Sequence, residues 1–253
     1  MKKLALLPVT LFALSSLTAL FSPVPRSAEA PTGKDALYRV QKTEDFEITG
    51  DGSSTQWERA EWIELVPRPS DSSTEVMDTR ARALWSDTGV YFLFHNQDRK
   101  LTATMDEDMM EIWREDVVEV FLWPDESRPV YFEYELSPLN VELALLVDNR
   151  DGDLNSWIPF SHTYHGDRLT RRKTTVTGGA AESGGGITGW TAEFFIPYEL
   201  MRPLNGVPPR SGSTWRANLY RIDYDDEQSR AFFWQPVEGS FHQYENYGTF
   251  QFD

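Results

Sequence analysis

The chain has 253 residues, of which 40% are hydrophobic and 13% aromatic, and its formal net charge at pH 7 is −16. This length and apolar content suit a packed core and exclude a chain that is disordered throughout. The absence of cysteine excludes disulfide scaffolds, thiolate metal sites and cysteine nucleophiles. The acidic excess argues against nucleic acid and anionic membranes as partners, because a phosphate-binding surface needs a basic stripe.

The first thirty residues have the pattern of a targeting segment. Lys2 and Lys3 precede an apolar run over residues 4–21, and Ala28-Glu29-Ala30 supplies a cleavage site of the A-x-A type. We predict a signal peptide over 1–30, a secreted or periplasmic protein, and no membrane contact after cleavage. The alternative is a retained N-terminal anchor, because the apolar run is about long enough to span a bilayer.

Strand patterns occupy almost all of the remaining chain. Thr79–Trp85 and the run 90–95 flank Ser86-Asp87-Thr88-Gly89, a turn cluster of hairpin length, and predict two antiparallel strands. Eight further runs are apolar or alternating, with turn signals between them. They cover residues 116–123, 130–137, 141–147, 169–176, 189–196, 214–222, 231–234 and 247–252.

These runs predict an all-β fold, a β-sandwich of the jelly-roll kind. One short helix is expected from Pro197 to Met201, because proline is well suited to the first turn of a helix. We divide the chain into the signal peptide, an N-terminal linker or edge strand over 31–45, and a single sandwich domain over 46–253.

Acidic residues interrupt two of the apolar strands. In the run 130–137, alternation places Phe132 and Tyr134 on one face and Glu133 and Glu135 on the other. Glu119 is a lone acid in the preceding run, and burial without a partner would cost several kcal/mol. We expect Glu119 to meet an arginine, a metal or a ligand. The alternative for Glu133 and Glu135 is the solvated face of an edge strand.

The tryptophans divide into two groups. Trp113 lies in an acidic loop just before the run that holds Glu119, where a ring can project towards a ligand. Sugars stack their C–H faces on aromatic rings and pair their hydroxyls with carboxylates, so Trp113 beside these acids indicates a sugar site. Trp85, Trp190 and Trp215 lie within strand patterns and are expected in the core.

Short motifs follow one another from about residue 46 to the C-terminus. They are Ile48-Thr49-Gly50-Asp51-Gly52 with Trp57, Arg82-Ala83-Leu84-Trp85-Ser86-Asp87, Ile112-Trp113-Arg114-Glu115-Asp116, Tyr131-Phe132-Glu133-Tyr134-Glu135, Gly189-Trp190-Thr191-Ala192-Glu193, Trp215-Arg216-Ala217-Asn218, and Trp234-Gln235-Pro236 with Phe241-His242. In order and spacing they resemble a family 9 carbohydrate-binding module of the stand-alone secreted kind.

This resemblance implies a non-catalytic β-sandwich that clamps a sugar between two aromatic rings, with a monosaccharide, an oligosaccharide or a polysaccharide end as its partner. Trp113 matches the first ring. The second falls near Phe241-His242, where this chain has no tryptophan. An arginine that contacts sugar in the founding kind aligns near Glu135, so the identity of the ligand does not carry over. The predicted carbohydrate-binding residues are Trp113, Glu119, Glu133, Glu135, Phe241 and His242.

An oxygen-rich loop is a candidate calcium site. It runs from Asp148 through Asp151 to Asp153, and the resemblance implies structural calcium because relatives often carry it. The spacing is not that of an EF-hand loop, and a plain turn is the alternative. Asp223, Asp225 and Asp226 form a second, poorer candidate.

Three functional classes remain open. The first, which we predict, is a secreted non-catalytic carbohydrate-binding protein that serves polysaccharide breakdown. The second is a glycan-active hydrolase, in which Glu119, Glu133 and Glu135 would supply the acid and the base or nucleophile. The third is a haem-binding sandwich of the dehydrogenase-accessory type, which would need a Met or His ligand pair. The sequence does not indicate an oligomeric state.

Overall fold

The computed structural model describes residues 32–68, 71, 77–150, 153–160, 164–225 and 229–253. Residues 31–253 form one compact unit, and the predicted signal peptide over 1–30 lies outside the described residues. In the described part of the chain, no helix has the length and apolar character needed to cross a membrane.

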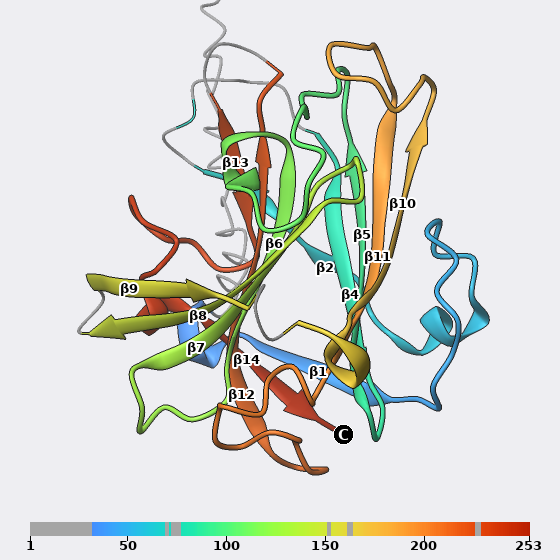
Figure 1. Cartoon of the computed structure of the whole chain (residues 1–253). Helices are drawn as coiled ribbons and strands as arrows, with labels where there is room; N and C mark the ends of the chain where they lie inside the picture. Colours follow the sequence, from blue (N-terminus) through green and yellow to red (C-terminus); the bar gives the residue numbers. More distant parts are fainter. Residues whose placement is uncertain (1–31, 69–70, 72–76, 151–152, 161–163, 226–228) are drawn as a thin grey trace, which may run out of the picture. The chain divides into compact units, whose positions relative to one another are not determined.

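Two β-sheets face each other in this unit (Figure 1). The first sheet has the strand order β10-β11-β5-β4, and the second has the order β14-β12-β6-β7-β8-β9. The first contains β4 (Thr79–Trp85), β5 (Gly89–Gln97), β10 (Arg171–Thr177) and β11 (Gly189–Pro197), with the short β2 (Ile63–Glu64) on β4. The second contains β6 (Val117–Trp123), β7 (Val130–Leu136), β8 (Glu142–Arg150), β9 (Asp153–Pro159), β12 (Thr214–Asp223) and β14 (Gly248–Phe252), with β13 (Arg230–Phe233) on β12 and β3 (Val66–Pro67) on β13.

One strand is shared between the sheets. β1 (Leu37–Lys42) pairs in parallel with β14 through its first four residues and in parallel with β4 through Gln41 and Lys42. The stretch 31–45, which the sequence presented as a linker or an edge strand, therefore contains an internal strand. Its run is only six residues long and half exposed, so its sequence carries little strand signal.

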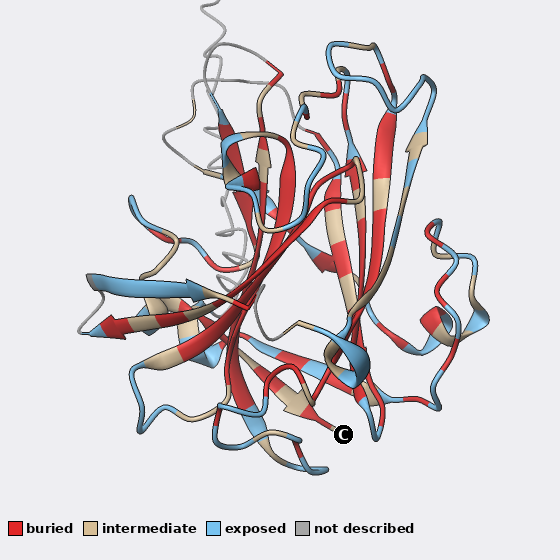
Figure 2. Ribbon diagram, in the orientation of Figure 1, coloured by how far each residue is buried: buried red, intermediate tan, exposed pale blue. Residues whose placement is uncertain are grey.

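Both faces of the central strands are covered, and Figure 2 shows them buried along most of their length. All seven residues of β6 are buried: Val118, Val120 and Leu122 face the core between the sheets, and Phe121 packs in a second cluster on the outer face. Strands covered on both faces have near-continuous apolar sequences. Across the inner core, the rings of Tyr134 on β7 and Phe194 on β11 lie 4.9 Å apart, which joins the two layers.

The expected all-β sandwich is confirmed. The predicted hairpin closes with Trp85 opposite Val90, and the N–H of Ser86 donates to the carbonyl of Gly89 over 2.9 Å. The eight other predicted runs all contain strands, with ends shifted by up to three residues. Trp85, Trp190 and Trp215 are buried, as expected of core residues.

The predicted helix at Pro197–Met201 is wrong. Pro197 ends β11, and the following residues form successive turns in which Leu200 and Met201 donate to carbonyls three residues earlier, over 3.1 and 3.0 Å. Pro203 disfavours helical backbone at the residue before it, so these turns cannot extend into a helix.

Candidate functional site

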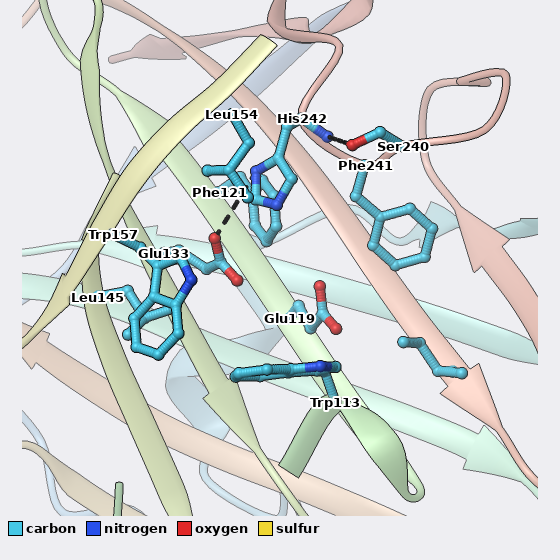
Figure 3. A pocket seen from close by; sticks show the side chains of 11 residues that line it. Trp113, Glu119, Phe121, Glu133, Leu145, Leu154, Trp157, Ser240, Phe241 and His242 are labelled. Atoms are coloured by element: carbon cyan, nitrogen blue, oxygen red, sulfur yellow. Dashed lines mark hydrogen bonds and ion pairs between the residues drawn. The ribbon is translucent and has the colours of Figure 1, made fainter. Parts of the chain in front are cut away.

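A pocket of about 290 Å³ opens on the outer face of the second sheet. Five of the six predicted sugar-binding residues line it: Trp113, Glu119, Glu133, Phe241 and His242. The other lining residues are Phe121, Leu145, Leu154, Trp157, Ile222 and Ser240. In Figure 3 the carboxyl groups of Glu119 and Glu133 lie between Trp113 and His242, with Trp157 and Phe241 on the two flanks.

The register of β6 and β7 brings the three glutamates together. Glu119 lies directly opposite Glu135, and Phe121 lies opposite Glu133, so all three acids point to the outer face. β7 lies between β6 and β8, and the three acids are at most 5% exposed, so the alternative of a solvated edge strand is wrong. Glu135 does not line the pocket and lies buried beside Glu119.

These acids lack compensating charge. One oxygen of Glu133 and both oxygens of Glu135 accept no hydrogen bond of ordinary geometry. Burial raises the pKa of Glu133 to about 7. Burial, and then the charge of Glu133, raises the pKa of Glu119 well above its usual range, and Glu135 is shifted in the same direction by burial and by both neighbours. Like charges that face each other across two strands repel, so the free cluster retains protons near neutral pH.

Trp113 is held by a short 3-10 turn, η3 (Ile112–Arg114), just before β6. Ile112 is fully buried beneath the turn, and the hydroxyl of Tyr224 donates to the carbonyl of Trp113 over 2.8 Å. Asp116 fixes the end of the turn, because its two oxygens accept from the backbone N–H groups of Thr102 and Tyr224 over 2.6 and 2.8 Å. The ring is therefore half-buried on a fixed backbone at the mouth of β6.

Trp157 is the aromatic residue that sequence reasoning missed. It lies on β9, opposite Val147 of β8, and its ring centroid is 5.9 Å from that of Trp113 at an interplanar angle of 77°. A register shift after Asp148 disturbs the alternation of the β8–β9 hairpin, so 153–159 shows no strand period. The available signal was the Asp151-Gly152 pair, a hairpin-turn dipeptide that implies a returning strand.

The segment that carries Phe241 and His242 is fixed by buried tyrosines. The hydroxyls of Tyr220 and Tyr247 both donate to the carbonyl of Phe241 over 2.9 Å, and the ring of Phe241 stacks on Tyr220 at 4.2 Å. The ring of Tyr220 therefore covers one face of Phe241, which leaves less of that ring for a ligand. This wall of the pocket is preorganised.

His242 is a neutral member of the site. Its Nδ1 is hydrogen-bonded to the hydroxyl of Tyr131 and lies 4.0 Å from an oxygen of Glu133. Burial lowers the pKa of His242 to about 4. Because the pKa of Glu133 is about 7, the two groups are both uncharged between these values and form no ion pair there.

The candidate calcium residues are only partly described. The oxygens of Asp148 accept from Asn155 over 2.7 Å and from Arg150 over 3.4 Å, whereas Asp151 and Asp226 lie outside the described residues, as does the side chain of Asp153. Calcium at this loop stays a prediction.

Among the described residues, one acidic group has oxygens close enough to share a metal: Asp98, Asp223 and Asp225. Arg221 lies 3.0 Å from Asp98, Arg230 lies 3.3 Å from Asp223, and Arg99 lies 3.3 Å from Asp225. The arginines already supply the positive charge that a cation would bring, so this group does not fit a metal site well.

Comparisons with known proteins agree on the fold and the family. Residues 48–205 match the model of the carbohydrate family 9 binding domain-like family. An extracellular protein of Arthroderma benhamiae is 30% identical over 138 residues, which are 52% of this chain and 58% of that protein. The chain therefore spans a little over half the length of this curated relative.

Solved structures share the fold at low identity. A suspected carbohydrate-binding protein of Bacteroides uniformis aligns with a TM-score of 0.72 at 16% identity, over 88% of this chain and all of that one. A family 9 carbohydrate-binding module of Caldicellulosiruptor kristjanssonii, in complex with cellotriose, aligns with a TM-score of 0.59 at 15% identity, over 85% and 93% of the two chains. Its glucose complex gives 0.58 at 16% identity, over 85% and 95%.

The family match covers more than half of the chain and spans the segments that build Trp113, Glu119, Glu133 and Trp157. The predicted resemblance is confirmed, and the chain belongs to the carbohydrate family 9 binding domain-like family.

Proposed function

We propose that this protein is a secreted, non-catalytic carbohydrate-binding protein whose pocket holds a sugar ring against Trp113, and that it serves polysaccharide breakdown. The observation that carries the proposal is the pocket itself, in which aromatic rings surround the carboxyl groups of Glu119 and Glu133. Rings for the C–H faces and carboxyls for the hydroxyls are the two components that sugar recognition needs.

The volume of the pocket suits a ligand of one or a few sugar units. Its volume of about 290 Å³ lies at the lower end of the range for small-molecule sites, roughly 300–1,000 Å³. A terminal sugar or a short oligosaccharide therefore suits it better than a long internal stretch of polymer. A protein of the same fold has been solved with glucose and with cellotriose, so hexoses are the first ligands to test.

Trp113 and Trp157 supply an angled pair of rings rather than a parallel clamp. Their planes are 77° apart, so a sugar that stacks on one ring meets the other at its edge. Trp157 is 41% exposed and stands on β9, which is exposed from Leu154 to Ile158 (Figure 2). In this proposal Trp157 takes the role that the resemblance assigned to the neighbourhood of Phe241 and His242.

Export through residues 1–30 is part of the proposal. It is supported by the charged start, the apolar run and the small-residue end of that segment, and by a relative that is named an extracellular protein. The mature protein should begin near Pro31. Mass spectrometry of exported protein that still carries residues 1–30 would contradict this part.

The absence of catalysis is part of the proposal, and the match to a family of binding domains supports binding over glycoside hydrolysis. A hydrolase would need one protonated and one ionised carboxyl group at the same pH, roles that Glu119 and Glu133 would have to divide between them. The purified protein should release no reducing sugar from polysaccharides. Release that is lost in Glu119→Gln would overturn the binding role.

The lining of the pocket also gives no support to the haem alternative. Among the described residues that line it, His242 is a histidine and none is a methionine, so the pocket does not provide a Met–His pair. An absorption spectrum checks this directly, because a Soret band would favour haem.

The decisive experiment combines a glycan array with two tryptophan variants. Trp113→Ala should lose roughly 1–3 kcal/mol of sugar binding and keep most of the folding stability, because its ring is half-buried on a fixed turn. Trp190→Ala is the core control: this buried ring donates to Asp98, and its truncation should cost about 3–5 kcal/mol of unfolding free energy. A Trp113→Ala protein that binds sugar as tightly as wild type would contradict the proposal.

A further inference from the structure

The pocket contains buried acid without a matching cation. Glu133 is more than nine-tenths buried, points into the pocket, and has one oxygen with no hydrogen-bond partner. In the described part of the chain, no arginine or lysine forms an ion pair with Glu119, Glu133 or Glu135. Elsewhere the protein does pair such groups, as when Arg172 contacts the buried Glu142. A buried carboxyl group without a partner lowers the stability of the fold, so its presence here needs an explanation other than stability.

The walls around these acids suit a positive charge. Trp113, Trp157 and Phe121 present aromatic rings to the same space as the two carboxyl groups. The ring of Phe241 is stacked on Tyr220 and lies against Arg68, so it is not one of these rings. A cation over the face of an aromatic ring is attracted by the negative face of the π-system, and the attraction grows when water is excluded. The same pocket therefore offers both aromatic faces and carboxyl oxygens to one cationic group.

We propose that the ligand is an amino sugar, a sugar unit whose free amine is protonated, and that its ammonium group is held by Glu119 and Glu133 while its ring stacks on Trp113. This inference rests on the proposed carbohydrate-binding function and names the class of sugar. The ammonium supplies the missing counter-charge, which the hydroxyls of a neutral hexose cannot do.

The other groups that face the acids carry no fixed positive charge toward them. Burial lowers the pKa of His242 and raises the pKa of the tyrosines around the cluster, so all are neutral near pH 7. These tyrosines are Tyr131 on β7, Tyr220 on β12, Tyr224 just after β12, and Tyr247 just before β14. Arg68 lies against the ring of Phe241 with its Cζ 5.6 Å from the centroid, and Arg114 pairs with Glu111 over 2.7 Å.

Binding of an ammonium group should therefore be linked to proton release. The free cluster holds protons near neutral pH, and an ammonium group between Glu119 and Glu133 favours their ionised forms. The affinity for an amino sugar should rise from pH 5 to pH 7.5, as the cost of removing those protons falls. A neutral sugar, which gains nothing from ionisation, should show no such rise.

The test is a calorimetric titration of the purified protein with glucosamine, glucose, N-acetylglucosamine and choline at pH 5 and pH 7.5. We expect glucosamine to bind at least tenfold more tightly than glucose or N-acetylglucosamine at pH 7.5, with a smaller preference at pH 5. Glu133→Gln should remove the preference, so that the affinities for glucosamine and glucose at pH 7.5 come within about twofold of each other, whatever the change in the affinity for glucose itself. Glu47→Gln is the matched control, because Glu47 is exposed and does not line the pocket, and it should change nothing.

The outcomes separate this inference from the proposed function. Equal or tighter binding of glucose, lost in Trp113→Ala, would overturn the amino-sugar assignment and leave the carbohydrate-binding role standing. A glucosamine preference that survives in Glu133→Gln would also overturn it, because the amine would then be bound by other residues. Choline that binds as tightly as glucosamine would show that the cation is bound without the sugar, against the assignment. Binding of no sugar by the wild type would overturn both.

Discussion

Two buried glutamate sites lie on the outer faces of the two sheets, and their hydrogen bonding is opposite. Glu193 on β11 accepts five hydrogen bonds: from the N–H and hydroxyl of Thr49, the N–H groups of Gly50 and Gly52, and the indole of Trp57, over 2.6–3.4 Å. On the second sheet, Glu133 and Glu135 have oxygens that accept none. Residue type and burial are the same in both places.

The contrast separates what the fold needs from what a ligand needs. Glu193 ties the segment around Thr49 and Trp57 over the first sheet, and positive φ angles at Gly50 and Gly52 turn their N–H groups inward. Two of the motifs that carry the family resemblance, Ile48–Gly52 with Trp57 and Gly189–Glu193, meet at this one carboxylate. A buried acid with every lone pair engaged acts in folding, whereas one with open lone pairs in a pocket is available to a ligand.

The largest test of this contrast is Glu193→Ala. The substitution leaves the buried N–H of Gly50 and the indole of Trp57 without an acceptor, so the free energy of unfolding should fall by about 3–5 kcal/mol. Urea unfolding measures it, with the exposed Glu47→Ala as the control. A loss below about 1 kcal/mol would show that the five bonds do not hold the segment.

The second test uses pH on the opposite site. The pKa of Glu133 is raised to about 7 in the fold, so the folded state binds a proton that the unfolded state releases above about 4.5. Unfolding free energy should therefore fall as pH rises from about 4.5 to 7, with Glu133 contributing on the order of 2–3 kcal/mol. Glu133→Gln should remove this contribution and be more stable than wild type at pH 8. Identical slopes for the two proteins would count against an uncompensated acid.

A third test addresses the pocket wall that sequence reasoning missed. Trp157→Ala should weaken sugar binding about fivefold, roughly 1 kcal/mol, which is less than Trp113→Ala because Trp157 is more exposed. Its neighbour Ile158, which is 55% exposed and does not line the pocket, gives the matched control Ile158→Ala. Equal losses in both variants would indicate an effect of strand β9 rather than of the ring.

The smallest effect is expected from chelation. The calcium predicted at the loop from Asp148 to Asp153 should stabilise the fold by mass action, so EDTA should lower the melting temperature by about one or two degrees and added calcium should restore it. Asp98, Asp223 and Asp225 are already paired with arginines and should not contribute to this change. An unchanged melting curve in EDTA would contradict the calcium site.

Most of the fold could be read from local patterns. The strands that supply Glu119 and Glu133 are apolar runs with turn signals on both sides. Their alternation separates Glu133 and Glu135 from Phe132 and Tyr134, and the pairing of the strands shows that the acids lie on the outer face. β9 is missed because it follows a register shift, and β1 is expected only as a linker or an edge strand because it is short and half exposed. The hydrophobic pattern of a strand is a weaker predictor where neighbouring strands, rather than its own sequence, determine its conformation.

The sequence predicts those residues of the site that lie in or beside a single well-marked strand, or that match the family motifs. Trp113, Glu119 and Glu133 stand in or beside strong strands, and the family resemblance points to Phe241 and His242. Trp157 joins them only through the β8–β9 hairpin, which local patterns do not indicate. One oxygen of Glu133 has no hydrogen-bond partner because none of the surrounding elements that the structure describes places a donor beside it. Sequence spacing does not encode such absences.

The strand shared by both sheets also constrains the order of folding. β1 is among the first strands to leave the ribosome, yet one of its two partners is β14, in which Thr249 pairs with Leu37 more than two hundred positions earlier. Pairings of such long sequence separation form slowly, because loop closure must precede the contact. The two sheets therefore cannot be joined through β1 until almost the whole chain has been synthesised. Until then β1 exposes an unpaired edge, which a chaperone or an extended, export-competent state would have to protect.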